Sequence, residues 1–302
     1  MSSGIKQVVQ IAPETTVNTT PSPFDRTTLE FTDCTLDQKA TTTESATIKD
    51  SRISSGTLVT GFEYAGDLTI EGQFAAADEL FAAAAYNEWD NDVLTFGGTL
   101  RKTFSILRGF KDVADYHIFS GVHVNQLDID IPDSGIVTFK FGLMGMGRAK
   151  ATVVPAGVVT AATSNPKITT VQIGSIKIDG SVVPGVCLTQ AAFSWNNNAK
   201  VQKCLGSGTG IGAILETLAA GTGNFTAAWS TNTSGFYEKQ FTNTPISLEI
   251  PILDTLGNKY ILSLPEVNVT ASLPTGKNSD ILTTQFSYTA ANQAPTLTRV
   301  HV

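Results

Sequence analysis

Residues 121–142 carry the pattern that most restricts the fold of this chain, a run in which polar and apolar side chains alternate. The apolar positions are Leu127, Ile129 and Ile131, and the polar positions between them are Gln126, Asp128 and Asp130. An alternation of period two is typical of a strand with one buried face. Residues 132–135, Pro-Asp-Ser-Gly, suit a tight turn, and a second alternating run follows them. The pattern therefore predicts a long antiparallel hairpin.

Composition extends this prediction to the rest of the 302 residues. Threonine is abundant, there are 26 glycines and 16 phenylalanines, and such a mixture favours strands and turns over helices. Hydrophobic residues make up 41% and charged residues only 16%, which excludes a disordered chain. Helices are predicted only for residues 75–86 and 234–241. The expected fold class is all-β with one or two short helices.

The formal net charge of −7 and the pI near 5.0 have the wrong sign for a protein that grips phosphate groups. Cys34, Cys187 and Cys204 show no paired or metal-binding spacing, so we expect buried free thiols. No catalytic, cofactor or metal residues are predicted. The first residues lack the apolar core of a signal peptide, and no run approaches the ~18 apolar residues of a membrane helix, so synthesis in a cytoplasm without membrane contact is expected.

An internal repeat organises the chain. The order of strand, long polar loop, strand, short helix, strands and hairpin occurs at 27–147 and again at 171–290. We therefore expect two tandem modules, with the long loops at 33–60 and 196–222. Residues 148–170 lack periodicity and are interpreted as a linker. Residues 1–26 are expected to form an N-terminal arm, and residues 291–302 a C-terminal tail.

One segment resembles a nucleotide site. Gly206–Gly212 satisfies a relaxed dinucleotide pattern, and residues 214–221 after it have a helical composition. Because no buried parallel strand precedes the glycines, a loop is the preferred interpretation. Two functional hypotheses stay open at this point. One is a β-sandwich binding or capsid-decoration module, and the other is an enzyme that uses this glycine loop.

Several loose motifs resemble the major tail tube proteins of long-tailed, siphovirus-type bacteriophages. In the first half they are Ile-Ser-Ser-Gly at 53–56, Gly-Phe-Glu at 61–63, the glycine-bounded strand 66–72, the Asp-Glu-Leu-Phe helix at 78–81 and the segment 116–127. In the second half they are Gly-Asn at 257–258 and Leu-Pro at 264–265. The resemblance spans most of residues 27–290.

The resemblance implies a structural virion protein rather than an enzyme. Each module would be a β-sandwich or partial barrel whose hairpins join those of neighbouring copies around a lumen. Genomic DNA would pass through that lumen during ejection without specific binding. The expected partners are further copies of the chain and the tape-measure, tail terminator and tail-tip proteins. The expected location is the virion tail, after assembly in the bacterial cytoplasm.

The resemblance also suggests which residues carry these roles. Gln126, Asp128 and Asp130 are the candidate lumen-facing residues, although the opposite assignment, with this face outside, stays open. Asp33, Asp50, Asn198 and Thr209 are the candidates for contacts between stacked rings. Two modules per chain would give three subunits in a pseudo-hexameric ring. Six subunits would form the ring if the second half is only an extension of a single module.

Overall fold

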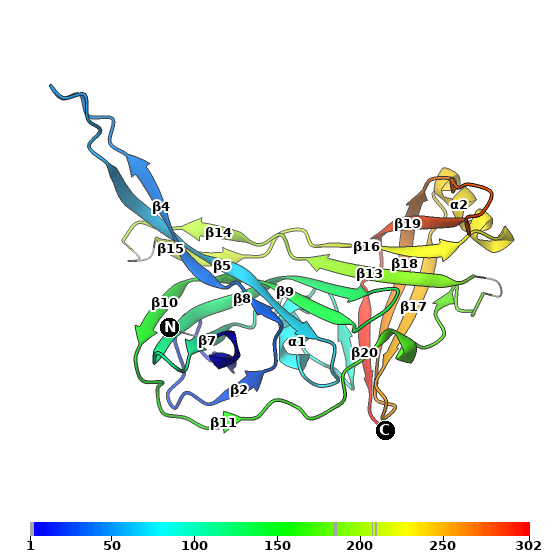
Figure 1. Cartoon of the computed structure of the whole chain (residues 1–302), viewed down its shortest axis with the longest axis horizontal. Helices are drawn as coiled ribbons and strands as arrows, with labels where there is room; N and C mark the ends of the chain where they lie inside the picture. Colours follow the sequence, from blue (N-terminus) through cyan, green and yellow to red (C-terminus); the bar gives the residue numbers. More distant parts are fainter. Residues whose placement is uncertain (1–2, 184–185, 207, 209) are drawn as a thin grey trace.

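A computed structural model describes residues 3–183, 186–206, 208 and 210–302. The structure is mostly β, with two α-helices and two short 3-10 turns, and its sheets do not close into a barrel (Figure 1). The all-β prediction is therefore confirmed. The helices are α1 (Asp78–Ala85) and α2 (Thr231–Thr242), which confirms both helix predictions.

The first half contains strands β1 to β11. Their bounds are β1 Gln7–Pro13, β2 Arg26–Leu29, β3 Asp33–Cys34, β4 Asp37–Glu44, β5 Thr57–Glu71, β6 Val93–Thr95, β7 Phe104–Phe110, β8 Asp115–Ile131, β9 Thr138–Gly145, β10 Gly147–Ala151 and β11 Val159–Thr160. The second half contains β12 Lys177–Ile178, β13 Leu188–Asn196, β14 Lys200–Lys203, β15 Ile211–Leu215, β16 Ala220–Ala228, β17 Ile246–Leu253, β18 Lys259–Ala271, β19 Thr283–Ala290 and β20 Thr296–Val300.

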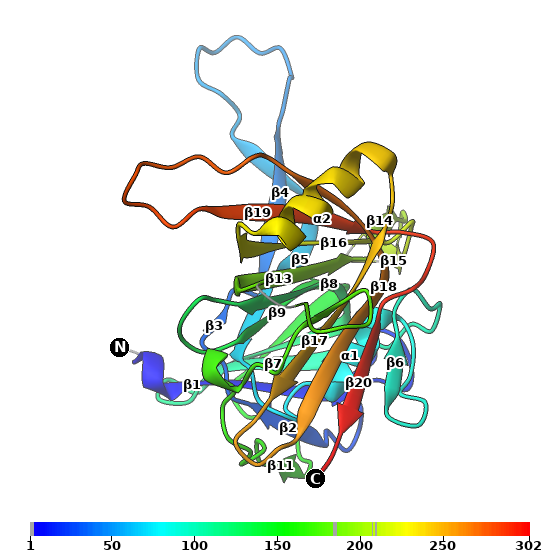
Figure 2. The same ribbon diagram turned by 90° about the vertical axis from the view of Figure 1, so that its right-hand side faces the viewer.

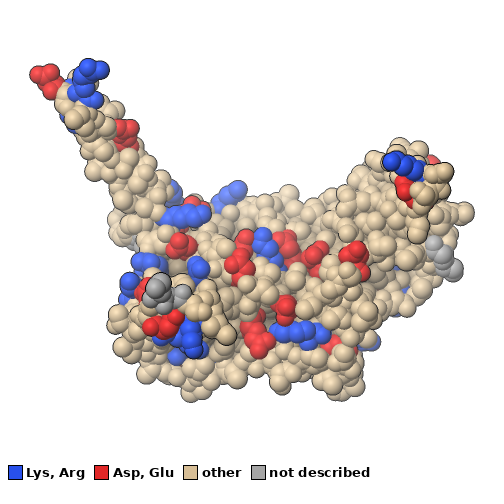
Figure 3. Space-filling view, viewed as in Figure 1, with Lys and Arg blue, Asp and Glu red and all other residues tan. Residues whose placement is uncertain are grey.

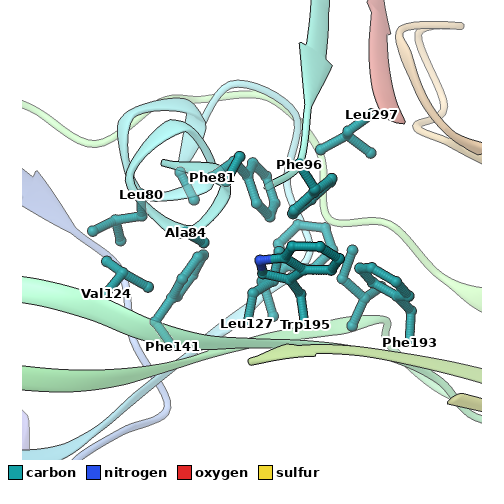
Figure 4. Packing of buried hydrophobic residues seen from close by; sticks show 14 of the residues in the cluster. Leu80, Phe81, Ala84, Phe96, Val124, Leu127, Phe141, Phe193, Trp195 and Leu297 are labelled. Carbon is teal, nitrogen blue, oxygen red and sulfur yellow. The ribbon is translucent and has the colours of Figure 1, made fainter. Parts of the chain in front are cut away.

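One antiparallel sheet runs through both halves in the order β5, β9, β8, β13, β16, β19, β18. One face of this sheet carries buried side chains that pack against α1. Figure 4 shows Phe81 and Ala84 of the helix above Phe141, Leu127 and Trp195 of the sheet. The hairpin predicted at 121–142 is the β8–β9 pair and is confirmed. Its apolar face forms the core that joins the two halves.

A second layer is formed by β1, β2, β7, β10 and the first part of β8. The 17-residue strand β8 belongs to both layers, because its residues up to Val122 pair with β7 and β10, and its residues from His123 onward pair with β9 and β13. Gly121 has φ +61°, a conformation that side chains disfavour, and it marks the transition. The face of this layer that carries Val9, Ile106 and Phe119 belongs to the main core, and a separate small core on its other face contains Val8, Phe24, Leu107 and Ile118.

The segments expected as linker and tail carry strands. Residues 148–170 contain most of β10, which pairs with β8, and all of β11, which runs parallel to β2. Residues 291–302 contain β20, which pairs with β18 of the second half and with β6 of the first half. The C-terminal strand therefore connects the halves directly. The division of the chain into two modules stays a prediction.

Two stretches expected as long loops contain strands over about half of their length. Residues 33–60 include β3, β4 and the start of β5, and the β4–β5 hairpin projects from the body as an arm (Figures 1 and 2). Residues 196–222 contain the β14–β15 hairpin and the start of β16. The helical composition of residues 214–221 does not give a helix, because these residues end β15, turn and begin β16.

The prediction of buried thiols holds only for Cys34, since Cys187 and Cys204 are exposed. Burial is the main cause that raises the pKa of the Cys34 thiol. Within the described part of the chain, neither helix has the length and apolar character needed to cross a membrane.

Candidate functional site

The face of the main sheet opposite α1 is polar along its whole width. Directly opposed residues form one row across eight strands, from β3 to β18: Asp33, Thr69, Lys140, Asp128, Ser194, Thr222, Thr289 and Asn268. Every member of this row is polar. The neighbouring row on the other face is Ile70, Phe139, Ile129, Phe193, Gly223, Tyr288 and Val269. We call the polar side of the sheet the polar face.

Asp128 lies at the centre of the polar face, where the two halves meet. Its carboxylate accepts hydrogen bonds from Gln126 Nε2 at 2.9 and 3.0 Å and from Ser194 Oγ at 2.6 Å. Asn196 Nδ2 in turn donates to Gln126 Oε1 at 3.2 Å. Because Ser194 and Asn196 lie on β13, this network connects the first half to the second. Bonds to a charged acceptor are among the stronger hydrogen bonds in proteins.

Lys140 is the one cation of the long row. Its Nζ lies 3.0 Å from Asp67 Oδ2, and this hydrogen bond is the main cause that raises the pKa of Lys140, with Asp128 and Asp33 contributing through their charges. Partial burial raises the pKa of the Asp130 carboxyl, although its side chain still reaches solvent. Acidic groups outnumber basic groups around this centre.

The second half of the polar face is almost uncharged. Its residues are hydroxyl and amide side chains on β16, β19 and β18: Thr222, Asn224, Thr226, Gln285, Ser287, Thr289, Asn268 and Thr270. Charged groups are sparse and of mixed sign on the surface that Figure 3 presents. A surface of this kind neither binds apolar partners strongly nor attracts phosphate groups.

The structure brings some of the sequence candidates together and separates others. Gln126, Asp128 and Asp130 share the polar face, and Asp33 lies in the same row rather than in a loop. Asp50 lies at the exposed tip of the β4–β5 arm. Asn198 is held in a turn before β14, where its amide N–H donates to Asn196 Oδ1 at 2.7 Å. Thr209 lies outside the described residues.

The arm carries exposed apolar side chains. Ile48 is 99% exposed, Ile53 78%, Leu58 64% and Val59 57%. Both arm strands are exposed along their outer parts, and β4 pairs only with β5 among the described strands. A long exposed edge with apolar side chains is a hazard for a free subunit and indicates a surface that is covered in an assembly.

The glycine-rich segment lacks the surroundings of a nucleotide site. Gly206, Gly208 and Gly210 have positive φ and belong to the turn between β14 and β15. Since a strand follows these glycines, no helix N-terminus is available for a phosphate there. The described residues also contain no cluster of three or more His, Cys, Asp or Glu side chains arranged for a metal ion.

Sequence reasoning missed most of the polar face. Lys140 alternates with Phe139 and Phe141 in the sequence, but the acidic groups near it, Asp67 and Asp33, come from strands 73 or more residues away in the chain. The polar positions of β16 and β19 alternate with apolar ones in the sequence, and this alternation is the signal that could have identified them.

The comparison with protein families agrees with this arrangement. Residues 4–295 match the family described as phage tail tube protein. No curated protein matches the sequence. Because the match covers nearly the whole chain, both halves included, the protein belongs to the phage tail tube protein family and is a structural component of the phage tail.

Proposed function

We propose that copies of this chain form stacked rings whose polar faces line a lumen, and that genomic DNA passes through this lumen during ejection. The observation that carries the proposal is the unbroken polar row from Asp33 to Asn268, which spans both halves of the chain. A wall of hydroxyl, amide and mainly acidic groups offers few cations that could replace the counterions of the DNA, so the DNA is not held there. Assembly would take place in the host cytoplasm, with the tape-measure, terminator and tail-tip proteins as further partners.

Three copies per ring fit the repeat within the chain. The strand order β5, β9, β8 of the first half matches β16, β19, β18 of the second, and a helix follows the first strand of each set. Each chain would thus supply two similar wall segments, and three chains would supply six. The rings would stack through the projecting elements, with Asp50 on the arm and Asn198 before β14 near these contacts. Thr209, outside the described residues, stays a candidate for the same contacts.

Thiol labelling of assembled tubes tests which face lines the lumen. Thr222→Cys places a thiol on the polar face, and Thr16→Cys places one in the exposed β1–β2 loop of the other layer. Both variants would be made with Cys187 and Cys204 replaced by serine. After labelling with biotin maleimide before assembly, streptavidin should decorate tubes with the Thr16 label along their length. It should reach the Thr222 label only at tube ends.

Uniform streptavidin decoration of the Thr222 variant would place the polar face outside and contradict the proposal. Subunits that form no tubes, even with tail-tip initiation proteins present, would contradict it as well. Electron micrographs of the same samples distinguish these outcomes.

A further inference from the structure

The chain contains one junction between two similar wall segments. Strand β8 of the first half pairs with β13 of the second half over six residue pairs. Asp128 lies opposite Ser194 on the polar face, and Ile129 lies opposite Phe193 on the buried face. This internal junction shows how the end of one segment fits the beginning of the next.

The two segments correspond residue by residue. A side chain at Gly66 would meet the Thr35 carbonyl oxygen at 2.5 Å, and one at Gly223 would meet the Ala192 carbonyl oxygen at 2.2 Å. In both halves the preceding strand passes over a glycine at this point. When Gly66 is matched to Gly223, the pairing register of β5 with β9 matches that of β16 with β19. The register of β8 with β9 matches that of β18 with β19 on both sides of a β-bulge at Asn125, which β18 lacks.

The two strands that form the internal junction are β8 and β13. Each has a counterpart in the other half of the chain, and the edge of that counterpart is open. Strand β18 is the counterpart of β8, and among the described strands none pairs with the outer edge of Val269–Ala271. Residues 34–38 of β3 and β4 are the counterpart of the part of β13 that pairs with β8. They pair only with β5 within the described part of the chain.

Side chains cap both open edges. Gln240 Oε1 accepts a hydrogen bond from the Ala271 amide at 3.2 Å, and Arg108 Nη1 donates to the Leu36 carbonyl at 2.9 Å. Both caps leave a buried donor atom, Gln240 Nε2 and Arg108 Nε, without a hydrogen-bond partner among the described residues. Buried donors are normally satisfied. The side chains of Gln240 and Arg108 therefore only partly replace the backbone hydrogen bonds that a neighbouring strand would make.

The β18–β19 hairpin also ends early. Its counterpart β8–β9 stays paired as far as Asp130 and Thr138, whereas β18 and β19 separate after Ala271 and Phe286. Residues 270–275, 283–285 and 287 line an open hollow of about 490 Å³ where the two strands diverge. Leu273 in this splayed segment is 59% exposed. Figure 2 shows the segment as a loop that projects from the body.

We propose that the open edge of β18 in one copy pairs antiparallel with residues 34–38 of the next copy and that residues 272–275 become strand on pairing. The inference rests on the proposed ring and names its interface. The partner strand comes from a second copy of the chain. At the internal junction β8, the counterpart of β18, pairs with β13, the counterpart of residues 34–38. Transferred residue by residue, the register places Ser272 opposite Asp37 and Leu273 opposite Leu36.

The side chains fit this register. Ser272 and Asp37 are both exposed, and opposite each other they repeat, with the two strands exchanged, the bond between Ser194 and Asp128 at the internal junction. Leu273 and Leu36 take the places of Ile129 and Phe193 on the buried face. A contact between two different edges is heterologous, and such contacts can close into a ring.

Disulfide trapping tests the register. In the proposed register Ser272 and Asp37 lie directly opposite each other, as Asp128 and Ser194 do at the internal junction. The Cα atoms of such a cross-strand pair lie within the separation that a disulfide requires. Ser272→Cys and Asp37→Cys would be combined in one chain with Cys34→Ala, Cys187→Ser and Cys204→Ser. The matched control combines Asp37→Cys with Leu273→Cys, a one-residue shift that points the new thiols to opposite faces of the sheet.

On oxidation of assembled tubes, the Ser272/Asp37 variant should give a ladder of linked chains on a non-reducing gel, at least fivefold more than the shifted control. Tubes that form without this ladder, or a stronger ladder from the control, would overturn the junction while leaving the tube intact. Failure of the parent chain to form tubes would instead contradict the proposed function. Amides of residues 271–275 should also exchange hydrogen at least tenfold more slowly in wild-type tubes than in free subunits, and equal rates would overturn the strand completion.

Discussion

Arg299 Nη1 on the C-terminal strand lies 2.7 Å from Asp78 Oδ2 in the first turn of α1. The same guanidinium contacts Asp92 Oδ1 at 2.8 Å and lies over the ring of Trp89, 4.3 Å from its centroid. Tyr260 of β18 donates a further hydrogen bond to Asp78. The last strand of the chain is thus attached to the helix that covers the sheet of the first half.

Loss of this attachment should destabilise the whole subunit. Arg299→Ala leaves the half-buried Asp78 without its cation, so we expect the free energy of unfolding to fall by about 2–3 kcal/mol. Urea denaturation of free subunits measures this change. In the control Arg101→Ala, the lost partner is Glu216 and the arginine is 43% exposed, so a loss below about 1 kcal/mol is expected. Equal losses in the two variants would contradict a special role for Arg299.

Gly223 should not tolerate a side chain. A Cβ atom there would lie 2.2 Å from the Ala192 carbonyl oxygen and 2.3 Å from the Tyr288 hydroxyl, which donates to that same carbonyl at 2.9 Å. We expect Gly223→Ala to cost about 3 kcal/mol, as measured by thermal unfolding. Gly235 in α2 has open space around it, so Gly235→Ala should instead stabilise the subunit by about 0.5–1 kcal/mol. A neutral Gly223→Ala variant would show that the strands can separate at low cost.

His123 should make the stability of the subunit depend on pH. Burial lowers the pKa of its imidazole, opposed by the hydrogen bond with the Gly121 carbonyl and by the charges of Glu14 and Glu216, while Arg101 lowers it further. Because the folded-state pKa lies below the unfolded value near 6.5, the neutral ring stabilises the fold above that pH. This contribution is lost as the pH falls from about 6.5 through the folded-state pKa.

Melting temperatures of wild type and His123→Gln between pH 7.5 and 4.5 measure this effect. The difference between the two proteins should shrink as the pH falls. The control is His301→Gln, which removes a ring that is 56% exposed. A constant difference between wild type and His123→Gln would contradict the prediction.

Reversing charges on the polar face should convert a passive wall into a DNA-binding one. Asp33→Lys with Asp130→Lys adds two exposed cations to that face. Tubes of this variant should retain double-stranded DNA, and the dependence of log K on log salt should steepen by ~0.9 for each phosphate contacted. The control reverses Glu88 and Asp90, both exposed just after α1, and should not retain DNA inside the tube. DNA retention by wild-type tubes at physiological salt would contradict a non-adhesive lumen.

The sequence predicts those parts of the fold whose signal is local. The β8–β9 hairpin follows from the alternation around Asp128 and a proline–glycine turn, and both helices follow from short stretches of composition. The β14–β15 hairpin was not predictable in the same way, because its strands are short and separated by glycines whose turn depends on pairing between Val201 and Ile214. The exposure of Cys187 likewise depends on what packs nearby.

The sequence predicts the part of the polar face that lies on β8, but not the other strands that extend this face across the sheet. The polar side of β8 is visible in the sequence, but Asp33 joins it only because β3 pairs with β5, and β5 with β9. The open edges at Leu36 and Ala271 leave no local pattern, since an edge is defined by the strand that is missing beside it. The caps from Arg108 and Gln240 come from β7 and α2 and are visible only in three dimensions.

A cryo-EM reconstruction of the assembled protein tests the central claim most directly, because it shows which surface forms the wall of the tube. The account predicts rings of three chains whose lumen is lined by the row from Asp33 through Asp128 to Asn268, with α1 outside the wall. A lumen lined by the α1 side, or a polar face turned to the outer surface of the tube, would contradict it.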